Sequence, residues 1–147
     1  MSVIDEIKSR LLARAAVVET PDFSRTGTHL LVAAPAAAIT GLAAFLDTEG
    51  FGLECIAGVD RLAEQTMEVV YDFYHFFYGI RCTVRVRLPR EKPELPTISA
   101  LYGGANWHER ETHEFFGIVF IGHPNLTPLL LPEDAAYHPL RKDFVNG

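Results

Sequence analysis

Two adjacent segments, residues 68–78 and 81–88, constrain the fold most strongly. The first, EVVYDFYHFFY, is dense in aromatic and β-branched residues, and Gly79 follows it. In the second, positions 82, 84, 86 and 88 are apolar, whereas 81, 85 and 87 are arginines. Such alternation is typical of a strand with one buried and one solvent-exposed face. The sequence therefore predicts a β-hairpin whose apolar face is covered by other elements.

The N-terminal half shows one helical pattern and one long apolar stretch. Apolar residues at helical spacing predict an amphipathic helix over residues 3–18, with Ser2 as its N-cap. Residues 30–46 carry no charge, but they are fewer than the ~20 residues that span a bilayer, and Pro35 interrupts them. We therefore expect no membrane span there. The stretch and its continuation predict a strand over 29–34, a helix from Pro35 to about Leu46 and a strand over 53–59.

Prolines and glycines divide the next part of the chain. Pro89–Pro96 is predicted to be a connector, and Thr97 is placed to cap a short helix that ends at Gly103-Gly104. A second helix is predicted from Asn106 to Gly117. At its start, Asn106 and Glu109 have the spacing of a variant capping box.

From Phe120 onward, prolines recur at positions 124, 128, 132 and 139, which excludes regular helix. The same stretch is too rich in leucine for a disordered linker, so it must pack against its own domain, a partner, or both. We predict an α+β domain over residues 1–120 and an extended, proline-rich, partner-binding tail over residues 121–147 that belongs to it.

Composition excludes several classes of protein. A chain of 147 residues fits one domain, and its net charge of -6 disfavours binding to nucleic acid by counterion release. Cys55 and Cys82 form no close pair, so this chain alone holds no iron–sulfur cluster. The start, MSVIDEIKSR, has two acidic residues where a secretory signal is positively charged, and no long apolar core follows it, which favours a cytosolic location.

The densest polar cluster is WHERETHE, residues 107–114. His108 and His113 are five residues apart, whereas a zinc-protease helix places its two histidines four apart. The pattern instead favours a solvated helix face, with Arg110 and Glu114 spaced to form an i,i+4 ion pair. No phosphate-binding loop or serine elbow is present, so we predict no catalytic, cofactor-binding or metal-binding residue.

Four motifs in the C-terminal third resemble one family. In this order and at about this spacing, they are typical of the 30-kDa, or C, subunit of respiratory NADH:quinone oxidoreductase, complex I. The motifs are ERE of Glu109–Glu111, FGI of Phe116–Ile118, GHP of Gly122–Pro124 and PLRKDF of Pro139–Phe144. The hairpin and the proline connector are also similar, so the resemblance covers about residues 60–147.

The resemblance implies a two-layer, single α+β domain with a mixed β-sheet, helices on one face and an extended C-terminal tail. It also implies a cofactor-free accessory subunit of the hydrophilic arm, peripheral on the cytoplasmic side of the cell inner membrane. The parent complex transfers electrons from NADH to quinone, coupled to proton translocation, with FMN and iron–sulfur clusters held by other subunits. The implied partners are the 49-kDa-type (D) subunit, which the tail wraps, and the cluster-carrying (B) subunit. Neither nucleic-acid binding nor a direct membrane span is expected.

The residues that the resemblance places at the partner interface come from the ERE, GHP and PLRKDF motifs. They are Glu109, Arg110, Glu111, Gly122, His123, Pro124, Pro139, Leu140, Arg141, Lys142 and Asp143. Two departures leave the parent assembly open. Glu114-Phe115 replaces the usual aspartate and Leu or Met, and Thr127-Pro128 stands where basic residues are common. An equivalent subunit of a membrane-bound hydrogenase or an F420 dehydrogenase is therefore an alternative.

Two further hypotheses belong to other classes of protein. A histidine-dependent metalloenzyme requires at least three of His108, His113, His123 and His138 to converge. A nucleic-acid binder would use the arginines of the hairpin, Arg81, Arg85 and Arg87, and would bind in a salt-sensitive way.

Overall fold

The computed structural model describes residues 2–14, 17–132 and 137–145. Its helices are α1 (Val3–Leu12), α2 (Phe23–Thr26), α3 (Ile39–Thr48) and α4 (Ala105–Phe116), with short 3-10 turns η1 (Ala36–Ala38) and η2 (Leu62–Glu64). Its strands are β1 (Val17–Glu19), β2 (Leu30–Ala34), β3 (Phe51–Arg61), β4 (Thr66–His75), β5 (Ile80–Pro89), β6 (Glu94–Pro96) and β7 (Val119–Ile121).

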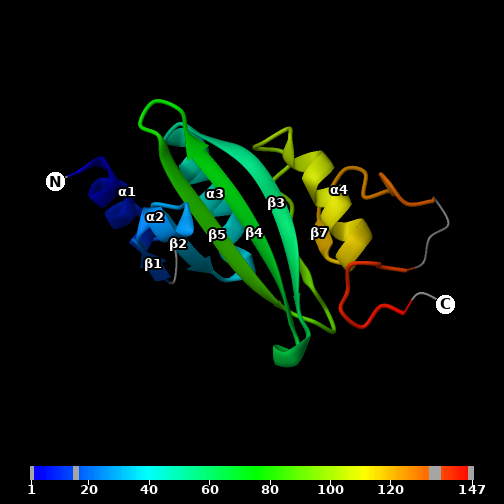
Figure 1. The fold of residues 1–147 in the computed structure, drawn as a ribbon. Coiled ribbons are helices and arrows are strands. Elements are labelled where there is room, and N and C mark those ends of the chain that lie inside the picture. The colour runs from blue at the N-terminus through cyan, green and yellow to red at the C-terminus, as the bar shows by residue number, and fades with distance from the viewer. Residues whose placement is uncertain (1, 15–16, 133–136, 146–147) are drawn as a thin grey trace.

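The predicted hairpin is the centre of a five-stranded sheet in the order β1-β2-β5-β4-β3 (Figure 1). Strands β4 and β5 pair in register from Thr66 opposite Pro89 to His75 opposite Ile80. The sheet is mixed, because β2 runs parallel to β5 whereas its other neighbouring pairs are antiparallel. Strands β6 and β7 form a separate two-stranded parallel sheet, so Ile121, the first residue of the predicted tail, pairs within the domain.

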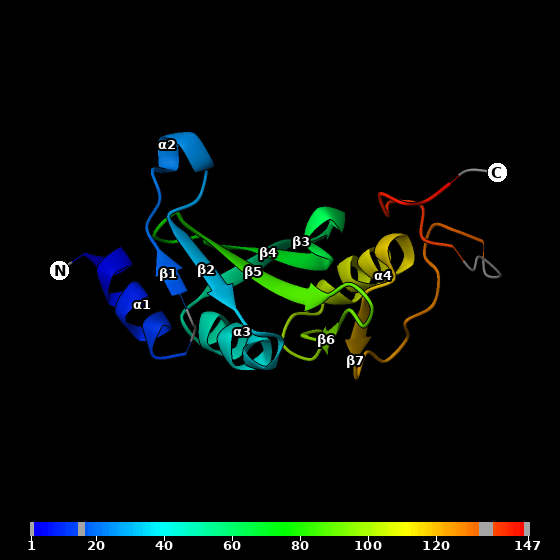
Figure 2. The ribbon, with the colours of Figure 1, turned by 90° about the horizontal axis from the view of Figure 1, so that it is seen from below.

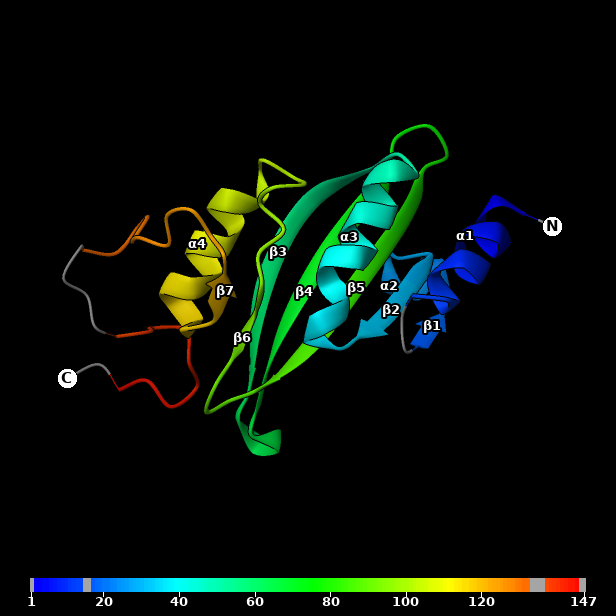
Figure 3. The same ribbon diagram turned by 180° about the vertical axis from the view of Figure 1, so that it is seen from behind.

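The core lies between the sheet and its longer helices. Met67, Val69, Tyr71 and Phe73 project from one face of β4 and are fully buried. Helix α3 lies along this face, and α4 lies beside it against β3 (Figure 3). The aromatic ring of Phe116 on α4 packs directly on Gly58 of β3, which pairs with Val69. The predicted fold class is therefore confirmed, although the short α2 lies on the opposite side of the sheet (Figure 2).

The N-terminal helix is shorter than the sequence predicts. Ser2 caps it as expected, since its hydroxyl accepts a hydrogen bond from the Asp5 amide at 3.1 Å. The helix ends at Leu12, however, and Val18 is a buried residue of β1 opposite Val32. A position that fits the helical apolar stripe thus serves an edge strand instead, while Ala15 lies outside the described residues.

The prediction of a short helix after Thr97 is wrong, because residues 99–101 form turns. The predicted capping box is also wrong. Helix α4 starts at Ala105 behind Gly104, so Asn106 lies inside the helix and Glu109 turns into the domain. The predicted end at Gly117 is confirmed, and its φ of 77° is the left-handed conformation that glycine adopts most easily.

The uncharged stretch over residues 30–46 forms β2, η1 and most of α3. In the described ranges, no helix is both long and apolar enough to cross a membrane.

Candidate functional site

Glu114 on α4 binds the backbone of the tail. Its carboxylate accepts hydrogen bonds from the amides of Leu129 and Leu130 at 3.0 Å, and from the amide of Leu131. The carboxylate is almost fully buried, with the residue 5% exposed. Hydrogen bonds to an ionised acceptor are about twice as strong as neutral ones, so one side chain fixes three successive residues of the tail.

Arg110 binds the adjoining stretch with the opposite polarity. Its guanidinium donates to the carbonyl oxygens of Thr127 at 3.1 Å and Pro128 at 3.0 Å. The i,i+4 ion pair expected between Arg110 and Glu114 is wrong, since each side chain binds the tail instead. The solvated helix face expected for this segment is wrong too, because Glu114 is buried beneath the tail.

The tail in turn caps the C-terminal end of α4. His138 hydrogen-bonds through Nδ1 to the Glu114 carbonyl at 3.0 Å, and Arg141 donates from Nε to the Phe116 carbonyl at 2.7 Å. The Leu140 amide donates to the Phe115 carbonyl at 3.1 Å. The last carbonyls of a helix lack partners within it and carry partial negative charge, so these donors stabilise its end.

A second anchor holds the PLRKDF motif at the end of β3. Arg90 binds the buried Asp60 carboxylate with two hydrogen bonds, of 2.9 and 3.0 Å, and also reaches Asp143 at 2.8 Å. The Lys142 amide donates to the same Asp60 carboxylate at 2.7 Å. The hydrogen bonds from Arg90, and then that from the Lys142 amide, hold the pKa of Asp60 below its usual range. Sequence reasoning missed Asp60 and Arg90, which lie far from the tail in sequence.

Glu109 lies inside the domain. It is fully buried and accepts hydrogen bonds from the Ile98 amide at 3.0 Å and from the Thr97 hydroxyl. Burial raises its pKa, while these two donors oppose the shift. His123 of the GHP motif approaches the same carboxylate at 3.9 Å and contacts the Asn106 carbonyl at 3.2 Å. Glu109 therefore ties α4 to the segment before it rather than facing solvent.

The remaining expected interface residues lie at the surface or partly exposed. Glu111, Gly122, Pro124, Lys142 and Asp143 are exposed, and Arg110, Pro139 and Arg141 are partly buried. Several large apolar side chains are exposed nearby: Trp107, Ile121, Leu130, Tyr137, Leu140 and Phe144. The tail is thus held by its backbone, by polar groups and by Leu126, which packs against the core, while several of its apolar side chains face outward.

The four candidate histidines do not form a metal site. Among the residues that the structure describes, no group of three His, Cys, Asp or Glu side chains could hold an ion. His113 binds the Ile118 carbonyl at 2.8 Å, and its ring centre lies 6.4 Å from that of His138. Burial lowers the pKa of His113. The convergence that a metalloenzyme requires is not observed.

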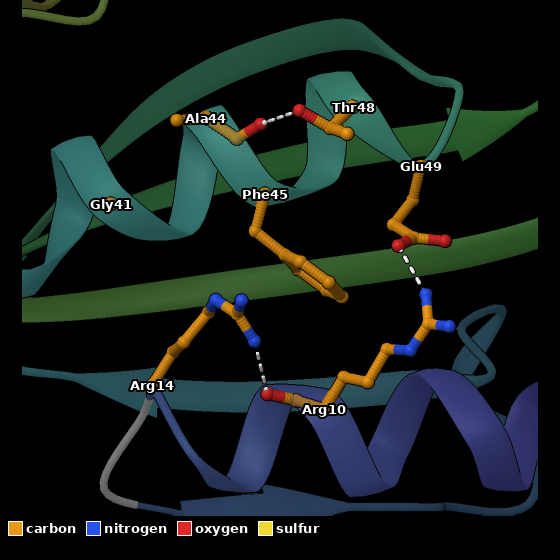
Figure 4. A pocket seen from close by; sticks show the side chains of 7 residues that line it. All are labelled: Arg10, Arg14, Gly41, Ala44, Phe45, Thr48 and Glu49. Carbon is orange, nitrogen blue, oxygen red and sulfur yellow. Dashed lines mark hydrogen bonds and ion pairs between the residues drawn. The ribbon is translucent and has the colours of Figure 1, made fainter.

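A cavity of about 490 Å³ lies between α1 and α3 (Figure 4). Its charged lining is already engaged within the chain. Arg10 pairs with Glu49, and Arg14 donates to the Arg10 carbonyl while its guanidinium stacks 4.4 Å from the ring centre of Phe45. This cavity therefore lies at the packing interface between α1 and α3, and we assign it no ligand.

The fold and the contacts along α4 define a mixed-sheet α+β domain that carries its own extended C-terminal segment on a helix. Residues 32–147 match the family model described as "Respiratory-chain NADH dehydrogenase, 30 Kd subunit". The chain belongs to this family, which confirms the resemblance seen in its motifs.

Relatives come from bacteria and archaea. The chain is 47% identical over 96 residues to the C subunit of NADH-quinone oxidoreductase from Roseiflexus sp. (strain RS-1), covering 65% of this chain and 55% of the relative. It is 41% identical over 90 residues to the C subunit of F(420)H(2) dehydrogenase from Methanosarcina mazei, covering 60% of this chain and 57% of the relative. The chain thus spans about half the length of these curated relatives.

Two solved structures share the fold. A trypsin-resistant fragment of Nqo5 superposes with a TM-score of 0.71 at 33% identity, covering 84% of this chain and 98% of the fragment. A chain of the membrane-bound sulfane sulfur reductase, an archaeal respiratory membrane complex, superposes with a TM-score of 0.81 at 28% identity. This match covers 96% of the present chain and 85% of the archaeal one.

Proposed function

We propose that the chain is a cofactor-free accessory subunit of the hydrophilic arm of a respiratory NADH:quinone oxidoreductase. Its contribution is positional, because it keeps the subunits that carry the redox centres in fixed relation. FMN, the iron–sulfur clusters and the NADH and quinone sites belong to those other subunits. The complex lies against the cytoplasmic side of the inner membrane.

The observation that carries this proposal is the way the tail is held. Arg110 and Glu114 bind residues 127–131 through the backbone, and the Leu140 amide binds the Phe115 carbonyl. The side chains of Leu130 and Leu140 are left 66% and 54% exposed. Exposed apolar side chains on an ordered segment favour an interface with another protein. An extended segment that is already ordered also loses less conformational entropy on docking than a flexible one.

The partners proposed are the 49-kDa-type (D) subunit for the tail and the cluster-carrying (B) subunit beside it. The contact residues are the exposed members of the motifs, chiefly Glu111, Pro124, Leu140 and Lys142. Glu109, Arg141 and His123 act indirectly, since they hold α4 and the tail in the conformation that the partner meets.

An equivalent subunit of a related membrane-bound assembly is the second candidate. The similarity to a subunit of an F(420)H(2) dehydrogenase and to a chain of the archaeal sulfane sulfur reductase complex favours it. In either assembly the chain would have the same positional role, and only the electron donor and acceptor would differ.

Affinity purification of the tagged chain from gently solubilised membranes, followed by mass spectrometry, tests the proposal. We expect NADH-binding, cluster-carrying and membrane-spanning oxidoreductase subunits to co-purify. Recovery of hydrogenase or F420 dehydrogenase subunits would establish the second candidate. Recovery of the chain alone, from the soluble fraction, would contradict both.

A further inference from the structure

The sheet has a second face, turned away from α3 and α4, and we call it the outer face. Glu68 of β4 lies on this face, where it pairs in register with Arg87 of β5. Three arginines surround its carboxylate, with nitrogen–oxygen distances of 3.3 Å for Arg61, 3.9 Å for Arg85 and 3.3 Å for Arg87. The Glu68 side chain is only 3% exposed, so the arginines cover it.

These charges do not balance. Three guanidinium groups against one carboxylate leave two positive charges in excess, on a chain whose net charge is -6. Elsewhere on the outer face, Arg81 pairs with Glu54, and Asp72 accepts hydrogen bonds from Thr83 and Cys55. Arg81 and Glu54 cancel each other, whereas Asp72 is bound by uncharged donors and offsets one of the two positive charges over the face as a whole. The local positive excess lies around Glu68.

Arg85 and Arg87 retain donors for a further partner. Their side chains are 46% and 60% exposed, and each lies more than 3 Å from the single carboxylate that they share. A guanidinium carries five N–H donors in a planar fork that matches a carboxylate. One buried acceptor beneath three arginines cannot satisfy all of these donors.

A cavity of about 520 Å³ adjoins the two arginines. Glu68 lines it together with these arginines, and the rest of its lining is apolar: Ala33, Ala34 and Pro35 at the end of β2. Ala33 lies opposite Arg85 in the parallel pair of strands, so a small side chain stands beside a long one and leaves the hollow between them. The cavity therefore offers cationic donors and an apolar wall to the same occupant.

We propose that an acidic segment of a neighbouring subunit docks in this cavity, with an Asp or Glu carboxylate bound by Arg85 and Arg87. This inference rests on the proposed role as a subunit and adds a second interface to that of the tail. The carboxylate neutralises part of the positive excess, and the apolar wall receives the residues next to it. A nucleic-acid phosphate suits the cavity less well, because the polar groups next to it along the backbone would face the apolar wall of Ala33, Ala34 and Pro35.

Zero-length cross-linking of the purified assembly tests the assignment. R87K and R85K keep the charge but supply an amine, which a carbodiimide couples to a carboxylate in direct contact. We expect each variant to yield an amide link between that position and an Asp or Glu of another subunit. R14K, at the end of α1 on the opposite side of the sheet, is the matched control and should give no link to that acidic residue.

A binding measurement provides a second, independent readout. The double variant R85A/R87A should bind the assembly from which the chain has been stripped about tenfold more weakly than the unaltered chain, whereas R14A should bind equally well. Links from positions 85 and 87 only to Glu68 of the same chain, with the assembly intact, would overturn the inference and leave the proposed function standing. Salt-sensitive filter binding of DNA lost in R85A/R87A would also overturn it. A chain that purifies with no other subunit overturns both proposals.

Discussion

Arg110 and Glu114 lie one turn apart on α4 and bind consecutive residues of the tail with opposite chemistry. The guanidinium donates hydrogen bonds to the carbonyls of Thr127 and Pro128, and the carboxylate accepts hydrogen bonds from the amides of residues 129–131. Because both side chains bind main-chain groups, Leu130 need not be buried to hold the tail, although Leu126 packs against the core. The tail is thereby ordered while part of its apolar surface stays exposed for a partner.

Replacement of Glu114 by glutamine should loosen the tail. The neutral amide has one acceptor oxygen for three amides, and we expect a loss of about 1–3 kcal/mol in the free energy of unfolding of the attached segment. Hydrogen–deuterium exchange of the amides of residues 129–131 measures this directly and should become faster. Glu111→Gln, on the exposed side of the same helix, is the control. Equal exchange rates in the two variants would show that Glu114 does not hold the tail.

Asp60 should make the stability of the domain depend on acid pH. Its pKa is depressed in the folded chain, so its contribution is fully present above the unfolded value of about 3.9 and is lost as the pH falls through the folded value. Asp60→Asn should lower the free energy of unfolding at pH 7 by about 1–3 kcal/mol and flatten its pH dependence below pH ~4. Denaturant titrations between pH 2 and 7 provide the measurement.

Asp143→Asn is the matched control for that experiment, because Asp143 binds the same guanidinium from an exposed position. We expect a smaller loss of stability than for Asp60→Asn. A larger loss of stability for Asp143→Asn than for Asp60→Asn would show that Asp143 is the more important partner of Arg90. That result would contradict the role given to Asp60.

A methyl group at Gly58 should disturb the packing of α4 on the sheet. A Cβ there would lie 2.6 Å from Cδ2 of Phe116, so the ring or the helix must shift. We expect Gly58→Ala to cost about 1–3 kcal/mol in the free energy of unfolding. Gly41→Ala, in a helical position with no atom within 4 Å, should instead add about 0.5–1 kcal/mol. Chemical denaturation measures the free energy of unfolding of both variants. The changes relative to the unaltered chain should have opposite signs, and a Gly58→Ala variant of unchanged stability would contradict the close packing of Phe116 on Gly58.

Arg141 and Lys142 are neighbours with different roles. Arg141 caps the Phe116 carbonyl with its side chain, whereas Lys142 contacts Asp60 only through its backbone amide. Arg141→Glu should therefore lower the stability of the isolated chain by about 1 kcal/mol, and Lys142→Glu should change it by less than about 0.5 kcal/mol. Both variants should reduce recovery of partner subunits. An equal loss of stability in the two would show that Lys142 also belongs to the domain's own packing.

The sequence was sufficient for the central hairpin of the sheet and for the end of α4. Alternation in β5 and the helix-ending Gly117 are local signals, and each is confirmed. Val18 and Thr97 show where local signals fail. Val18 fits a helical stripe but lies in an edge strand, and Thr97, the expected helix cap, precedes a turn and binds Glu109. Tertiary pairing decided both positions.

The attachment of the tail could not be predicted because it depends on long-range contacts. Asp60 and Lys142 meet across 82 residues, and no spacing rule relates them. The prediction of a solvated face for the polar residues of α4 was wrong for the same reason. Glu114 looks solvated as a helix residue, and only the folded tail covers it.

The most direct test of the central claim is to make the exposed leucines of the tail polar and measure what co-purifies. L130S/L140S should lose the oxidoreductase subunits recovered with the unaltered chain, while the isolated variant unfolds at an unchanged temperature. Leu12→Ser, an exposed leucine on α1, should retain them. Full recovery of the same subunits with L130S/L140S would contradict the claim that the tail presents these side chains to a partner.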